Sequence, residues 1–164
     1  MSTPLYESFD TDSTGSFNNP NSPSCWYYRE NPGAQGYGYI TSSTFNLSPY
    51  AGNQMYFIYN AGDSAIEALI SPAIMGLDSG NKQLDLYMAN STFTVGTDVI
   101  IGSVSSPTDL SNLNIIDTVS VPNGSSWNKY TVYIDSASGY NMSCLLYTSP
   151  SPRDRSLSRM PSSA

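Results

Sequence analysis

The chain has 164 residues and a formal net charge of −7, and only 12% of its residues are charged, against about 25% in an average soluble domain. This length is sufficient for one domain with its own hydrophobic core. Six Lys and Arg residues in the whole chain argue against a nucleic-acid surface, which needs clustered cations. The absence of an apolar run of about 18 residues argues against insertion into a membrane.

The first half of the chain consists of short β-rich runs separated by turn residues. We predict a first strand at Leu5–Phe9, followed by a loop around the two prolines of "FNNPNSPS". Further short strands are predicted at Cys25–Tyr28, Tyr37–Thr41, Met55–Tyr59 and Ala65–Ser71. Pro72 closes the last of these strands, because proline cannot donate a backbone hydrogen bond to a sheet.

Two segments in the second half, "KQLDLYMA" and "WNKYTVYID", alternate between apolar and polar residues. This alternation is typical of strands with one buried face. The residues expected on the buried faces are Leu84, Leu86 and Met88 in the first segment and Tyr130, Val132 and Ile134 in the second.

Two longer β-rich runs, Asp98–Val104 and Ile115–Val121, complete the predicted strands. Between them, Pro107–Asp109 is predicted to begin a helical turn, because Thr and Asp satisfy free N–H groups at helix starts. Some nine short strands without a strong helical pattern predict an all-β fold, an antiparallel β-sandwich of the jelly-roll type.

Three acidic residues, Glu7, Asp10 and Asp12, cluster in "YESFDTD" at the end of the first predicted strand. Clustered carboxylates are hard oxygen ligands that suit Ca²⁺, although the spacing is not that of an EF-hand loop. The alternative is a group of solvated acids at a strand end. Both interpretations stay open on the residues alone.

Aromatic residues are abundant in the first half of the chain, and exposed rings on a sheet can stack on the faces of sugars. Tyr28, Tyr37 and Tyr39 are the candidates for such a surface. Strand alternation is expected to bury about half of the rings, and Trp26 and Trp127 are predicted to be core residues.

The sequence argues against an enzyme. It contains no histidine, which removes the usual Ser-His-Asp and Cys-His arrangements and histidine-ligated zinc. The serine of "GDS" (62–64) therefore has no evident base. Asp63 and Glu67 could be imagined as a glycosidase carboxylate pair, but scattered acids form such pairs by chance.

The last 21 residues, "CLLYTSPSPRDRSLSRMPSSA", carry three of the six basic residues, whereas residues 1–143 have a net charge of −9. A Ser/Pro/Arg-rich tail is typically disordered, and it could also be a phosphorylation target. Its codons, however, resemble a sequencing-library transposase adapter, in one frame on both sides of a sample index. We therefore predict that residues 144–164 are a non-native disordered tail and that residues 1–143 are a C-terminally truncated domain.

Six segments, in the same order and spacing, resemble the choice-of-anchor J domains of Bacteroidetes surface proteins, which are close to cleaved-adhesin domains and more distantly similar to MAM domains. The segments are "LYESFDTDSTG", "SPSCWYY", "EALISPAI", "KQLDLYMA", "VIIGSVSSPTDLSNLNIIDTV" and "SSWNKYTVYID". They cover about residues 4–140. The family's last strands are not found, and they would follow Tyr140.

The resemblance implies a jelly-roll domain of a secreted or cell-surface protein, often next to other domains, with the signal peptide outside this fragment. It implies a non-catalytic adhesion module whose partner is a glycan or an extracellular matrix protein. The alternative is a structural spacer or ancillary domain of a secreted peptidase or glycosidase. Relatives bind structural Ca²⁺ through the acidic residue of the first strand, which corresponds to Glu7, with Asp10 as a less secure neighbour.

Overall fold

The computed structural model describes residues 5–30, 36–60, 66–77, 80–91, 96–135 and 144–149, the last of these for the backbone alone. The strands are β1 (Tyr27–Glu30), β2 (Tyr37–Thr41), β3 (Met55–Tyr59), β4 (Glu67–Ile70), β5 (Lys82–Met88), β6 (Thr97–Ser103), β7 (Asn114–Val121), β8 (Asn128–Ile134) and β9 (Cys144–Ser149). Among these residues there is no helix, and so none that could cross a membrane. The predicted all-β class is confirmed.

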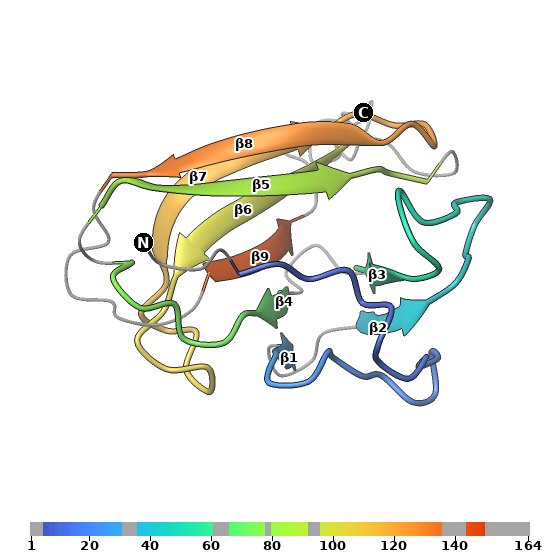
Figure 1. Cartoon of the computed structure of the whole chain (residues 1–164), viewed down its shortest axis with the longest axis horizontal. Coiled ribbons are helices and arrows are strands. Elements are labelled where there is room, and N and C mark those ends of the chain that lie inside the picture. The colour runs from blue at the N-terminus through green and yellow to red at the C-terminus, as the bar shows by residue number, and fades with distance from the viewer. Residues whose placement is uncertain are drawn as a thin grey trace, which may run out of the picture.

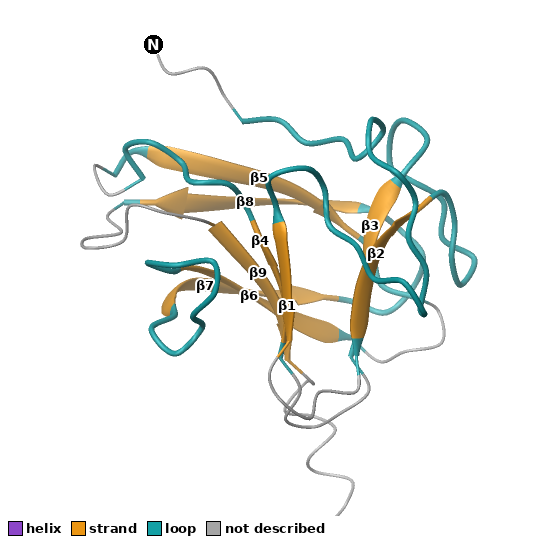
Figure 2. Ribbon diagram, turned by 90° about the horizontal axis from the view of Figure 1, so that it is seen from below, coloured by secondary structure: helices purple, strands orange, loops and turns teal. Residues whose placement is uncertain are grey.

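The strands form three antiparallel sheets (Figure 1). The largest has the order β1-β4-β9-β6-β7, and the other two are the pairs β2-β3 and β5-β8. Figure 2 shows β5-β8 lying across the β6-β7 side of the large sheet, with β2-β3 at one end of the layers. This packing of two antiparallel layers is the predicted β-sandwich.

The core between the two layers is aliphatic. Ile101 of β6 packs with Val132 of β8, and both are almost completely buried. Leu84 and Leu86 of β5 pack against the same cluster, because every second side chain of β5 points inward. The predicted buried faces of β5 and β8 are therefore confirmed.

Most predicted strands appear within two residues of their expected bounds, but two local predictions are wrong. Leu5–Phe9 is not a strand; Phe9 has φ of 65°, which bends the chain, and its N–H is bonded to the Glu7 side chain. The segment around Pro107–Asp109 is a tight turn closed by the Ser106–Asp109 bridge, because one turn of helix without neighbouring helical residues is unstable.

The segment Cys144–Ser149 belongs to the predicted tail, yet it forms β9. It pairs with β4 on one side and with β6 on the other. The difference has a physical reason, since both neighbours would otherwise present free backbone N–H and C=O groups. The remaining residues of the predicted tail lie outside the described part of the chain.

Candidate ligand-binding surface

One face of the β2-β3 pair is made of aromatic rings. In the register, Tyr37 faces Tyr59 and Tyr39 faces Phe57, so these four side chains share one side of the pair. Phe17 and Phe45 extend the set from two neighbouring turns. We call these six residues (Phe17, Tyr37, Tyr39, Phe45, Phe57 and Tyr59) the aromatic face.

Tyr37 is the centre of the aromatic face. Its ring centroid lies 5.1 Å from that of Tyr59 and 5.8 Å from that of Tyr39, both in stacked arrangements, and 4.8 Å from that of Phe17 in an edge-to-face arrangement. Partial burial is the main cause that raises the pKa of the Tyr37 hydroxyl above its ordinary value, and the neighbouring Tyr39 and Tyr59 raise it further. The hydroxyl therefore stays protonated and able to donate at any physiological pH.

Two tight turns hold Phe17 and Phe45 of the aromatic face in place. Ser16 and Asn19 exchange two backbone hydrogen bonds around Phe17, and Thr44 and Leu47 do the same around Phe45. Phe45 has a positive φ of 42°, a conformation that is costly for a bulky residue. Phe17 is 62% exposed and Phe45 is 45% exposed, so both rings are available to a ligand.

The structure brings the predicted residues Tyr37 and Tyr39 together but not Tyr28. A Cβ atom added to Gly38, which lies on the opposite side of β2, would be 2.9 Å from the Tyr28 ring. The Tyr28 hydroxyl donates to Glu30 at 3.3 Å. Tyr28 is therefore a half-buried residue behind the aromatic face.

The tryptophans are not core residues as predicted, because each is only half-buried. Trp127 donates its ring N–H to the Ser48 carbonyl at 2.9 Å and lies beside Tyr50. Its polar ring nitrogen finds a partner at the sheet margin, whereas the aliphatic core offers none.

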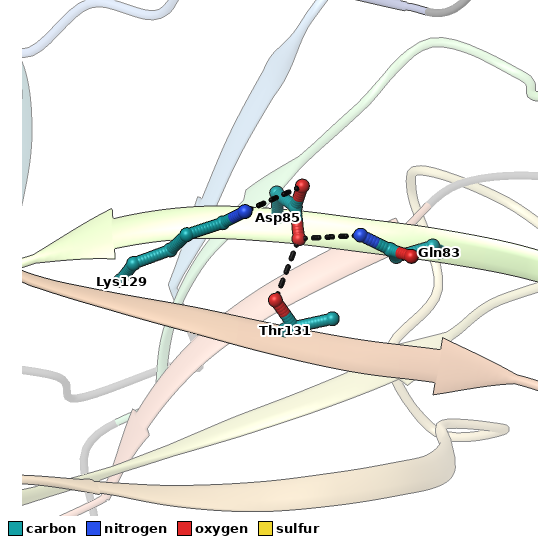
Figure 3. Close-up of polar contacts among 4 residues, drawn as sticks. All are labelled: Gln83, Asp85, Lys129 and Thr131. Atoms are coloured by element: carbon teal, nitrogen blue, oxygen red, sulfur yellow. Dashed lines mark hydrogen bonds and ion pairs between the residues drawn. The ribbon is translucent and has the colours of Figure 1, made fainter.

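The outward face of β5-β8 carries a polar network (Figure 3). Asp85 accepts hydrogen bonds from Thr131 at 2.7 Å and Gln83 at 2.8 Å and forms an ion pair with Lys129 at 3.1 Å. The hydrogen bonds from Thr131 and Gln83, together with Lys129, lower the pKa of Asp85. The polar groups of this network thus already have partners.

The predicted cation ligands are both engaged with backbone N–H groups. Glu7 accepts the N–H of Phe9 at 2.7 Å, and Asp10 accepts those of Asn53 at 2.7 Å and Gln54 at 2.9 Å. The described part of the chain contains no group of three or more His, Cys, Asp and Glu residues arranged for a metal. Asp63 lies outside the described residues.

Four residues of the aromatic face were not among the sequence candidates. Phe57 and Tyr59 could have been found, because they alternate on one face of the same predicted strand. Phe17 and Phe45 could not, since each is followed by Asn in a turn whose position depends on the fold. Only the exposure of both rings beside β2-β3 reveals them.

A scan against models of known protein families finds no match, and a search of curated proteins finds none either. Two solved structures have the same fold. The K2 cleaved adhesin domain of Lys-gingipain has a TM-score of 0.62 at 14% identity and matches over 88% of each chain. The K1 cleaved adhesin domain of Lys-gingipain from Porphyromonas gingivalis W83 has a TM-score of 0.60 at 17% identity, over 91% of this chain and 89% of that one. The chain therefore has a cleaved-adhesin-like fold.

A third similar structure is the enzymatically active domain of tailspike protein 4 from bacteriophage CBA120. Its TM-score is 0.49 at 15% identity, and the match covers 78% of this chain and 18% of that one. This likeness is too low to carry an argument about fold or function.

Proposed function

We propose that this chain is a non-catalytic binding module of a secreted or cell-surface protein and that it holds a glycan on the aromatic face. The observation that carries the proposal is the continuity of six rings on one side of β2-β3, three of them exposed. The fold adds support, because both similar domains are adhesin domains of a larger protein.

The chemistry of the aromatic face suits a neutral saccharide. The C–H groups on the face of a pyranose pack against aromatic rings, and the tyrosine hydroxyls offer hydrogen-bond donors at the ring edges. The six residues include no charged side chain, so the surface offers no ion pair to an anionic sugar.

Replacing Tyr37 by alanine is expected to lower glycan affinity about tenfold. The substitution removes the central ring, and an aromatic contact contributes about 0.5–1.5 kcal/mol. The upper end of this range corresponds to a tenfold change in Kd, which is about 1.4 kcal/mol. The measurement is a glycan-array screen of the full chain, followed by calorimetric titration of the best ligand. Tyr133→Ala is the matched control, because Tyr133 is 67% exposed on the distant β5-β8 pair.

Equal binding by wild type and Tyr37→Ala would contradict the assignment of the site. Binding to an extracellular matrix protein, without binding to any glycan, would contradict the assignment of the ligand.

We also propose that Glu7 and Asp10 contribute to a structural Ca²⁺ site. Both supply carboxylate oxygens, the type of ligand that Ca²⁺ prefers. The buried side-chain oxygen of Gln54 has no hydrogen-bond partner, and the backbone of Gln54 is bonded to Asp10. An unpaired oxygen on a residue whose backbone binds a carboxylate is compatible with a hard cation, and further oxygen ligands are needed to complete its coordination.

Calcium is expected to raise the Tm of the full chain, and Glu7→Gln is expected to reduce that rise. Ca²⁺ at about 100 times its Kd stabilises the folded state by about 2.7 kcal/mol, which corresponds to several degrees. Thermal unfolding is compared in Ca²⁺ and in chelator. Asp117→Asn, an exposed acid on β7, should keep the full rise; an equal rise in wild type and Glu7→Gln would exclude Glu7 as a ligand.

A further inference from the structure

The Glu67 side chain is fully buried in β4, with 0% of its surface exposed. Neither of its carboxylate oxygens has a hydrogen-bond partner. An ionised carboxylate in this state is strongly unfavourable, so native proteins pair such a group with a cation or protonate it. Glu67 therefore lacks a partner that its chemistry requires.

Other oxygen atoms converge on the Glu67 carboxylate. Glu30 lies directly opposite Glu67 in the β1-β4 register. Gly36 lies next to it as well, since a Cβ atom added there would be 2.0 Å from a Glu67 oxygen and 2.4 Å from the Tyr59 carbonyl oxygen. The Tyr28 hydroxyl donates a hydrogen bond to Glu30 at 3.3 Å. Glycine is required at position 36, because the Glu67 carboxylate and the Tyr59 carbonyl lie where a side chain would begin.

No basic side chain of the described residues neutralises this group. Arg29 donates to the carbonyls of Pro107 and Tyr28, Lys129 pairs with Asp85, and Lys82 lies on β5. Burial and, second, the charge of Glu30 raise the pKa of Glu67 to about 7. The two facing carboxylates therefore have no positively charged side chain as a partner among the described residues.

We propose that Glu67, Glu30 and the Tyr59 carbonyl bind a hard divalent cation of the Ca²⁺ class. Carboxylate and carbonyl oxygens are the ligands that Ca²⁺ takes, and its flexible geometry accepts six to eight of them, including water. Glu30 is exposed, so a hydrated cation has a route in from solvent. This site is separate from Glu7 and Asp10, because Glu7 accepts the N–H of Phe9 and Asp10 accepts the N–H groups at 53–54, and within the described part of the chain neither bonds to β1 or β4.

Terbium(III) is a suitable probe, because it occupies Ca²⁺ sites and emits when a nearby tyrosine is excited. The full chain is titrated with Tb³⁺ at pH 7, and Ca²⁺ is then added as the competitor. Wild type is expected to give tyrosine-sensitised emission that Ca²⁺ displaces, since Tyr28 lies at the site. Glu30→Gln should lower the affinity of this component at least tenfold, and Glu67→Gln should abolish it.

Glu7→Gln and Asp117→Asn are the controls and should keep the component. Glu30→Gln changes an exposed side chain, so it tests the site even if Glu67→Gln fails to fold. The proposal would be overturned by wild type without sensitised emission at millimolar Tb³⁺. Unchanged Tb³⁺ affinity in Glu30→Gln would overturn it as well, and so would loss of the component in Glu7→Gln alone.

Discussion

A chain that ends at residue 143 is expected to aggregate, whereas a chain that ends at residue 149 is expected to fold as a monomer. β9 is the central strand of the large sheet. Its residues pair with Glu67–Ile70 of β4 on one side and with Asp98–Ser103 of β6 on the other. Without it, the sheet separates into β1-β4 and β6-β7. Two facing edges then carry unpaired backbone groups, which recruit strands from other chains.

The comparison uses size-exclusion chromatography with light scattering and then thermal unfolding of the soluble fraction. The chain that ends at 149 is the control, because it lacks residues 150–164 but keeps β9. The pairing of β9 uses backbone groups, so the effect does not depend on whether these side chains are native. A monomeric chain 1–143 that unfolds as cooperatively as chain 1–149 would show that β9 is dispensable.

Replacing Glu67 by glutamine is expected to stabilise the cation-free protein above neutral pH by about 1–3 kcal/mol, because the wild type then buries an ionised carboxylate without a partner, whereas the amide carries no charge. In the wild type, burial and then Glu30 raise the pKa of Glu67 from 4.5 to about 7. Between these two values the unfolded chain has released the proton and the folded chain retains it. The free energy of unfolding therefore falls as the pH rises from about 4.5 to 7.

Glu67→Gln removes this dependence, because the amide does not ionise. Urea unfolding in chelator at pH 4 and pH 8 measures the difference between variant and wild type. The two should be equally stable at pH 4, and the variant should be more stable at pH 8. Asp117→Asn should show no such divergence from wild type with pH, and parallel curves for wild type and Glu67→Gln would mean that the Glu67 carboxylate is solvated or paired.

The strands were the most predictable part of the fold. Tyr37–Thr41 and Met55–Tyr59 have the same bounds in the sequence prediction and in the structure. Alternation also identified the inward residues of β5 and β8, such as Leu84 and Val132. These predictions succeed because a strand with one solvent-exposed and one buried face has polar and apolar residues in alternation, a pattern that can be read from the local sequence.

The sequence by itself determined the all-β class, most strand positions, the acidic and aromatic composition, and the candidates Tyr37 and Tyr39. Only the tertiary structure decided that Phe17 and Phe45 join these tyrosines, that Tyr28 does not, and that Glu67 faces Glu30. The physical reason is range: side-chain alternation is a local property of the chain. The strand order, by contrast, depends on which distant edges satisfy one another's backbone groups, and that order sets which side chains meet.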